Sequence, residues 1–181
     1  MKKIKYSIED LYKNLDITNS WINNSDNKAS IMIAFLGFSL FELFKNTDYT
    51  DCIYNVLKKC ISNINFSDCL FLLFIGISFI LILLGIYKLL KVLVPSLKNN
   101  KNIPESLIYY GYISNVESLK YKELVKNATE ENIIDDLINQ NYINSKICFR
   151  KFNNFRYGTF LIFLGIILNI IMVGLGIIIY K

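Results

Sequence analysis

Two long runs without a charged residue, residues 69–87 and 157–180, constrain this chain more than any other feature of its sequence. An α-helix needs about 20 apolar residues to cross the roughly 30 Å hydrocarbon core of a bilayer. A third run, residues 29–44, is shorter and contains Glu42. The chain is 53% hydrophobic and 19% charged, which is too apolar for an ordinary soluble domain. The three runs therefore predict three transmembrane helices.

The distribution of lysine and arginine predicts the orientation of these helices. Five of the 20 basic residues precede the first run, three lie between the first and second, eleven lie between the second and third, and one ends the chain. Basic residues accumulate on cytoplasmic loops. We therefore expect the N-terminus and residues 88–156 to be cytoplasmic, and Lys181 to lie outside. The N-terminal residues show no cleavable signal peptide.

The remaining segments favour helices that continue from the spans. Ile4, Ile8, Leu11, Leu15 and Ile22 recur at helical spacing ahead of the first span. The chain is thus expected to be an all-α membrane protein, with three transmembrane helices and a small cytoplasmic helical bundle continuous with them. Its expected segments are an amphipathic N-terminal helix (1–28), transmembrane helix 1 (29–45), an external loop (46–68), transmembrane helix 2 (69–87), a cytoplasmic helical sensing region (88–156) and transmembrane helix 3 (157–180).

Capping residues predict where several of these helices begin and end. Ser7 with Asp10 is expected to cap the first helix, and Ser114 with Glu117 to cap a helix that ends near Lys126. Pro95 is expected to end the helix of the second span. Thr129 is expected to start a last helix that runs unbroken into the third span, because no glycine or proline occurs between residues 129 and 157.

Small residues line one face of the third span. Gly158, Gly165, Asn169, Met172 and Gly176 fall near one line of that helix. Small residues let helix backbones approach, and an asparagine in hydrocarbon seeks a partner. This face is expected either to pack against the other spans of the same chain or to mediate homo-oligomerisation. The first span has a comparable face at Ser30, Ala34 and Gly37, and its Glu42 is expected to contact the headgroup region rather than line a polar pathway.

The residue inventory argues against a metal centre and against catalysis. The chain has no histidine, and its four cysteines show no paired spacing. Cys52 and Cys60 share the expected outer loop, where a disulfide is permitted, although two cysteines in a small loop are more often incidental. No phosphate loop or nucleophile–base pair is present, and the adjacent Asp135 and Asp136 are expected on a solvated face. We therefore expect no enzyme activity, no metal and no cofactor.

Polar and aromatic residues cluster near the expected cytoplasmic border of the membrane. The first cluster contains Trp21, Ile22, Asp26, Lys28 and Ala29 ahead of the first span. The second contains Tyr110 and Gly111, and the third contains Gln140, Ser145, Lys146, Ile147, Arg150 and Lys151 ahead of the last span. In order and spacing they resemble the transmembrane effectors of Pycsar, a bacterial anti-phage system, over most of residues 15–175. Tyr112 stands where that family has an acidic residue.

The resemblance implies a protein that senses a cyclic nucleotide, most readily cUMP or cCMP, on the cytoplasmic side and then disrupts the inner membrane in abortive infection. Such a ligand needs a cation for its phosphate, an aromatic face for its base and polar groups for the base edge. The predicted ligand-binding residues are Trp21, Asp26, Lys28, Tyr110, Gln140, Asn144, Arg150 and Lys151. The expected partners are this nucleotide, the lipid bilayer and further copies of the chain, with no nucleic acid polymer.

Each of these residues also has a purely structural interpretation. Lys28, Arg150 and Lys151 suit a positively charged membrane flank, and Trp21 suits an interfacial aromatic. A ligand-independent, holin-like pore former or an accessory membrane subunit therefore stays open as an alternative function. Binding of cUMP or cCMP by the purified protein would separate these possibilities.

Overall fold

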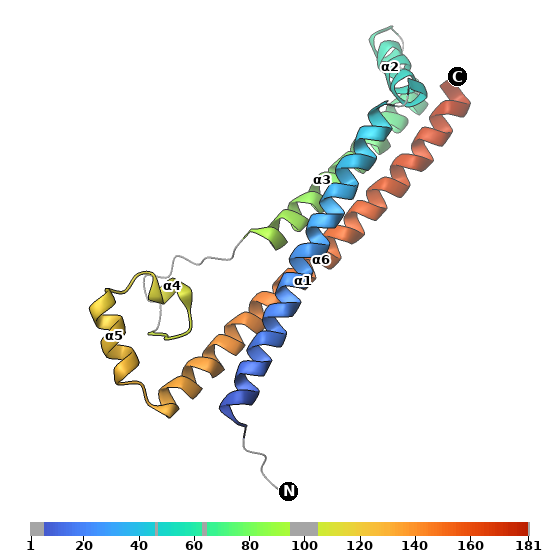
Figure 1. The fold of residues 1–181 in the computed structure, drawn as a ribbon. Helices are drawn as coiled ribbons and strands as arrows, with labels where there is room; N and C mark the ends of the chain where they lie inside the picture. Colours follow the sequence, from blue (N-terminus) through green and yellow to red (C-terminus); the bar gives the residue numbers. More distant parts are fainter. Residues whose placement is uncertain (1–5, 46, 63–64, 95–104, 181) are drawn as a thin grey trace, which may run out of the picture. The chain divides into compact units, whose positions relative to one another are not determined.

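A computed structural model describes residues 6–45, 47–62, 65–94 and 105–180 (Figure 1). The described residues form helices joined by short turns, with no β-strand among them. The helices are α1 (Ile8–Lys45), α2 (Thr47–Ser62), α3 (Phe66–Leu93), α4 (Tyr110–Ile113), α5 (Ser118–Lys126) and α6 (Glu130–Tyr180).

Three of these helices, α1, α3 and α6, are long and apolar enough to cross a membrane. They contain the three runs that the sequence marked as spans, so the prediction of an all-α membrane protein with three spanning helices is confirmed. The side of the membrane on which each connecting segment lies stays a prediction from the basic residues.

Local sequence explains most of the helix boundaries. Ser7 and Asp10 form the expected capping box, in which the Ser7 N–H donates to Asp10 Oδ2 at 3.0 Å and the Asp10 N–H donates to Ser7 Oγ at 3.1 Å. Helix α3 ends at Leu93, two residues before Pro95. Thr129 and Asn132 cap α6 reciprocally, and α6 then continues for 51 residues. The unbroken last helix is therefore confirmed.

Two local predictions differ from the structure. Ser114 belongs to the end of α4, where its hydroxyl donates to Gly111 O at 3.3 Å, so the predicted capping box with Glu117 is wrong. Helix α5 begins at Ser118 without a side-chain cap and ends at Lys126 as expected. The segment predicted as an external loop contains the 16 residues of α2. The side chains of Cys52 and Cys60 lie outside the described residues.

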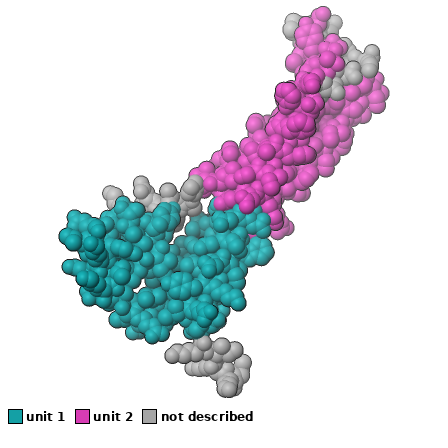
Figure 2. All heavy atoms as spheres, in the orientation of Figure 1, with its two compact units in different colours: residues 1–25, 95–151 teal, residues 26–94, 152–181 magenta. Residues whose placement is uncertain are grey.

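The chain divides into two compact units (Figure 2). Unit 1 comprises Met1–Ser25 with Pro95–Lys151, and unit 2 comprises Asp26–Val94 with Phe152–Lys181. Helices α1 and α6 therefore contribute residues to both units. The core of unit 2 draws on all three long helices, through Ala29, Leu36, Ile82, Leu89, Val92 and Ile162.

Glycines bring α3 and α6 into close contact within unit 2. A Cβ atom added to Gly85 would lie 2.8 Å from Gly158 O, and one added to Gly165 would lie 2.8 Å from Ser78 O. Gly158 and Gly165 are buried. The small face of the third span is thus used within the chain, against the second span, which was one of its two predicted roles.

A polar contact joins the same two helices. Asn169 Nδ2 donates to Ser78 Oγ at 3.0 Å, and Ser78 Oγ donates to Ile75 O at 2.7 Å. Asn169 is 2% exposed, and its Oδ1 atom has no hydrogen-bond partner among the described residues. The asparagine predicted to seek a partner in hydrocarbon therefore finds one for its amide N–H₂ group within the chain.

The corresponding small face of the first span is not used in this way. Ser30, Ala34 and Gly37 are exposed, and a Cβ atom added to Gly37 would meet nothing within 4 Å. Glu42 is also exposed on α1. Glu42 lies about 80–140° around the helix from the three small residues, so these positions together belong to a broad exposed side of α1 rather than to one narrow face.

Candidate functional site

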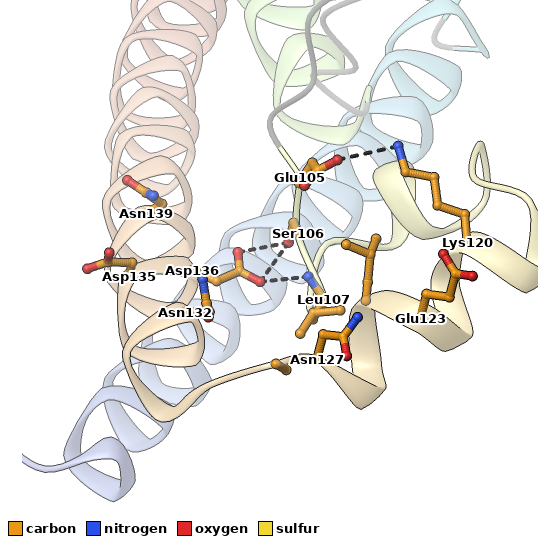
Figure 3. Close-up of a pocket in the computed structure, with 12 residues that line it drawn as sticks. Glu105, Ser106, Leu107, Lys120, Glu123, Asn127, Asn132, Asp135, Asp136 and Asn139 are labelled. Atoms are coloured by element: carbon orange, nitrogen blue, oxygen red, sulfur yellow. Dashed lines mark hydrogen bonds and ion pairs between the residues drawn. The ribbon is translucent and has the colours of Figure 1, made fainter.

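In unit 1, the chain segment before α4 is anchored to α6 through one carboxylate. Asp136 accepts hydrogen bonds from Ser106 Oγ (2.8 Å) and from the Leu107 N–H (2.8 Å), as Figure 3 shows. Ser106 Oγ in turn accepts from the Tyr109 N–H at 2.8 Å and from Gln140 Nε2 at 3.4 Å. Ser106 is 5% exposed and Gln140 is 6% exposed. The predicted site residue Gln140 is therefore part of a buried polar network.

A pocket of about 400 Å³ lies beside this network. Helix α5, the segment before α4 and the first turns of α6 form it (Figure 3). Its lining residues are Glu105, Ser106, Leu107, Lys120, Glu123, Leu124, Asn127, Ala128, Asn132, Asp135, Asp136 and Asn139. Amide groups and carboxylates in such a pocket are suited to hydrogen bonding with a neutral polar group, such as the edge of a nucleobase.

The charge of the pocket disfavours an anion. Four carboxylates line it, against one ammonium group, that of Lys120. Lys120 Nζ lies 3.4 Å from Glu105 Oε1, in an exposed ion pair. A phosphate placed here would meet more like charge than opposite charge, which raises its electrostatic energy. This pocket is therefore unsuited to the phosphate of an anionic ligand.

Two asparagines of α6 bond to α1 within unit 1. Asn141 Nδ2 donates to Leu11 O at 2.9 Å, and Asn144 Nδ2 donates to Asn19 Oδ1 at 2.9 Å. Asn144 was a predicted ligand residue, and the structure gives its amide a partner on the neighbouring helix. Trp21, two residues beyond Asn19, is 50% exposed and interacts with another group of the chain. It therefore presents part of its ring surface.

The basic residues Arg150 and Lys151 differ in exposure. Arg150 is exposed, whereas Lys151 is only 8% exposed. Both interact with other groups of the chain. A buried ammonium group needs such compensation, because its desolvation is costly. Tyr110, the predicted second aromatic, is 66% exposed and packs beside Tyr109, with ring centroids 5.2 Å apart.

The predicted residues do not all belong to one unit. Trp21, Tyr110, Gln140, Asn144, Arg150 and Lys151 belong to unit 1, whereas Asp26 and Lys28 belong to unit 2. Asp26 is half-buried with a partner in the chain, and Lys28 is exposed. A role for Asp26 and Lys28 in ligand binding stays a prediction from the sequence.

Sequence reasoning missed Ser106 and misplaced Asp136. Asp136 was expected on a solvated face, but it is half-buried and holds the segment before α4. The available signal was the serine two residues after Pro104, since serine hydroxyls commonly cap a following turn. Tyr112, at the position of the family's acidic residue, is 8% exposed, and its hydroxyl has no hydrogen-bond partner among the described residues.

No group of histidine, cysteine, aspartate and glutamate residues suited to a metal ion occurs in the described part of the chain. Cys148, on α6 in unit 1, is half-buried, and burial raises the pKa of its thiol.

Comparison with known proteins agrees with these features. The chain is 25% identical over 179 residues to the Pycsar effector protein GmPycTM of Gulbenkiania mobilis, an alignment that covers 92% of this chain and 91% of that protein. No solved structure matches the chain. The model of the Pycsar effector protein domain matches residues 10–179, which include all three candidate spans and the polar network of unit 1. This chain is a member of the Pycsar effector family, the membrane effectors of a cyclic-nucleotide-based anti-phage defence.

Proposed function

We propose that this protein binds a pyrimidine cyclic mononucleotide, cUMP or cCMP, through unit 1 and responds by disrupting the integrity of the inner membrane. The observation that carries the proposal is the family match over residues 10–179, since that span contains both the polar unit and the three apolar helices. Loss of membrane integrity during infection would end phage growth together with the cell. The proposed role is non-enzymatic.

The chemistry of the side chains in unit 1 suggests which residues contact the base of such a ligand and which contact its phosphate. The side-chain amide of Asn144 suits the edge of a base, and the exposed rings of Trp21 and Tyr110 offer stacking surfaces. The anionic phosphate favours Arg150, whose guanidinium can donate two parallel hydrogen bonds. Lys28 and Lys151 are the further proposed cations, with Trp21, Asp26, Gln140 and Asn144 as polar or aromatic contacts.

The proposed orientation places the N-terminus and residues 88–156 in the cytoplasm, where a cyclase would supply the ligand. It is supported by the eleven basic residues between the second and third apolar runs. Helices α1 and α6 carry residues of both units without a break, so a ligand-dependent change in unit 1 has a continuous path along each helix. A ligand shifts such an equilibrium only by its differential affinity for the two states.

Membrane disruption is proposed to require several copies of the chain. Three helices in one chain enclose little space, whereas a ring or cluster of copies can perturb a larger membrane area. The predicted partners are thus the cyclic nucleotide, the bilayer and further copies of the same protein.

The test combines binding with toxicity. Purified protein in detergent is titrated with cUMP, cCMP and cAMP by calorimetry, and the same chain is expressed with and without a pyrimidine cyclase. We expect a pyrimidine nucleotide to bind and toxicity to depend on the cyclase. Lys28→Ala and Gln140→Ala should lose that toxicity while they still accumulate in the membrane, and Lys13→Ala, another exposed lysine of α1, should retain it.

Two results would remove the proposal. Killing by the parent chain without any cyclase would favour the constitutive pore former. Absence of binding by all three nucleotides, with the protein folded by circular dichroism, would remove the sensing role.

A further inference from the structure

Of the three candidate spanning helices, α1 has the smallest share of buried residues and is also the least apolar. In an apolar stretch of 18 residues, α1 has a mean hydropathy of 1.3 with 11% of the residues buried, α3 has 3.0 with 28%, and α6 has 2.8 with 28%. If the exposed surfaces all faced lipid, the most exposed helix would be expected to be the most apolar one, because polar and charged groups on a lipid-facing surface are costly. The apolar rings exposed on α1 are compatible with lipid, but the exposed Glu42 and Lys45 on the same helix favour contact with protein at that level.

The exposed side of α1 combines large rings with both signs of charge. Phe35, Phe38 and Phe41 are each more than half exposed, at 57%, 65% and 64%. Glu42 and Lys45 are exposed on the same helix, and neither forms an ion pair among the described residues. At 100° per residue, Phe38, Glu42 and Lys45 fall on the side opposite to the buried Leu36.

Charge complementarity identifies the occupant. Glu42 and Lys45 are three residues apart, so they differ by about 4.5 Å in height along α1. In a parallel pair of α1 helices related by a twofold axis, Glu42 of each copy can therefore approach Lys45 of the other copy, which gives two equivalent ion pairs. Each copy of the chain carries both halves of this pattern, so a second copy satisfies it without any other partner.

The alternative interface is already occupied. The small residues of α6, which the sequence offered for self-association, pack against α3 of the same chain at Gly158 and Gly165. On α1, by contrast, Ala34 is exposed and lies about 20° from Lys45 and about 80° from Glu42 around the helix, so it would let a second backbone approach there.

We infer that α1 is the surface through which two copies of this chain associate in the membrane, with Glu42 of one copy paired to Lys45 of the other. The inference deepens the proposed self-association and rests on it, but it does not depend on which nucleotide is sensed. Lipid on this face is the outcome that would contradict it.

Cysteine cross-linking in membranes tests the surface directly. In a chain whose four cysteines are replaced by serine, Ala34→Cys on the exposed face of α1 is compared with Leu73→Cys on α3 and Phe163→Cys on α6, which are exposed in unit 2 as well. Oxidation with copper phenanthroline, without a cyclase, should give a disulfide-linked dimer at position 34 at several times the yield of the other two. No dimer at position 34, or equal yields at all three positions, would overturn the inference.

A charge exchange tests the pairing. Glu42→Lys and Lys45→Glu should each reduce the yield of the Ala34→Cys dimer, because each places like charges at the contact, and the double exchange should restore it. Insertion is checked for every variant by resistance to alkaline extraction. A double exchange that fails to restore the dimer while inserting normally would refute the charge pairing. A normal dimer in a chain that binds no nucleotide would refute the proposed function and leave this surface intact.

Discussion

Replacement of Gly165 by alanine provides the sharpest test of the α3–α6 contact. The new Cβ atom would lie 2.7 Å from Ile82 Cγ1 and 2.8 Å from Ser78 O, whereas ordinary contact begins at 3.4 Å. Ile82 is a side chain that can turn, but Ser78 O belongs to the backbone of α3. The two helices must therefore separate by about 0.6 Å at this point.

The expected loss of stability has two sources. Overpacking of a close contact costs about 1–3 kcal/mol. The same separation would stretch the hydrogen bond from Asn169 Nδ2 to Ser78 Oγ, now 3.0 Å, beyond good geometry one turn away. Such a bond within a membrane protein contributes about 0.6 kcal/mol. Because alanine is also a better helix former than glycine by about 1 kcal/mol, we expect Gly165→Ala to lower the free energy of unfolding by about 1–2.5 kcal/mol in total.

The matched control is Gly174→Ala on the same helix. A Cβ atom at Gly174 meets nothing within 4 Å. Because alanine is a better helix former than glycine by about 1 kcal/mol, this variant should be neutral or slightly more stable. Both variants are unfolded reversibly in mixed micelles by increasing dodecyl sulfate, with loss of helical circular dichroism as the signal.

Equal midpoints for the two variants would refute the packing argument. A difference in the opposite direction, with Gly174→Ala the less stable, would show that a second copy or lipid contacts the outer face of α6 more closely than α3 contacts its inner face. Only a clear loss confined to Gly165→Ala agrees with the structure.

Three further predictions concern single polar groups. Ser78→Ala should reduce the stability of the chain in mixed micelles, because the Asn169 amide loses its acceptor, whereas Ser39→Ala should not, because that hydroxyl donates within its own helix. Asp136→Asn should increase amide hydrogen exchange in the segment before α4 without a change in α3, since a neutral amide holds two donors less strongly than a carboxylate. Hydrogen bonds from Ser7 lower the pKa of Asp10, so its contribution to stability is present at neutral pH and is lost as pH falls through the lowered pKa; Ser7→Ala should raise that pKa in an NMR titration.

Apolar runs and caps made the spanning helices predictable from sequence. Residues 69–87 and 157–180 could hardly be anything but helices in lipid, and Ser7 with Asp10 formed the capping box that the pattern indicated. These signals are local, because each depends on residues within a few turns. The predicted cap at Ser114 was also a local pattern, but α4 ends at this residue and its hydroxyl donates to Gly111 O instead.

The polar network of unit 1 was much less predictable. Gln140 was identified through a family pattern, but its contact with Ser106 joins residues 34 positions apart, and no periodicity encodes that pairing. Asp136 was misread because a carboxylate on a polar helix is usually solvated, and only the path of the segment before α4 gives it two donors. Long-range contacts of this kind depend on loop conformation, which sequence patterns constrain weakly.

The contacts of the three long helices suggest which of them moves when the protein responds. Separation of α3 from α6 would open the glycine contacts at Gly85 and Gly165 and break the Ser78–Asn169 hydrogen bond. Apart from the buried Ala29, helix α1 meets its neighbours in unit 2 through larger side chains, including Leu36 and a stacked Phe44–Phe79 pair with ring centroids 6.0 Å apart. Side chains of this kind can repack over a small shift more readily than a backbone contact can. In unit 1, the same α1 is bonded through flexible amides of α6.

We therefore expect α3 and α6 to stay paired while α1 shifts, and nucleotide should change the cross-linking yield at Ala34→Cys far more than the yield between α3 and α6. A ligand-dependent change confined to the α3–α6 contact would contradict this.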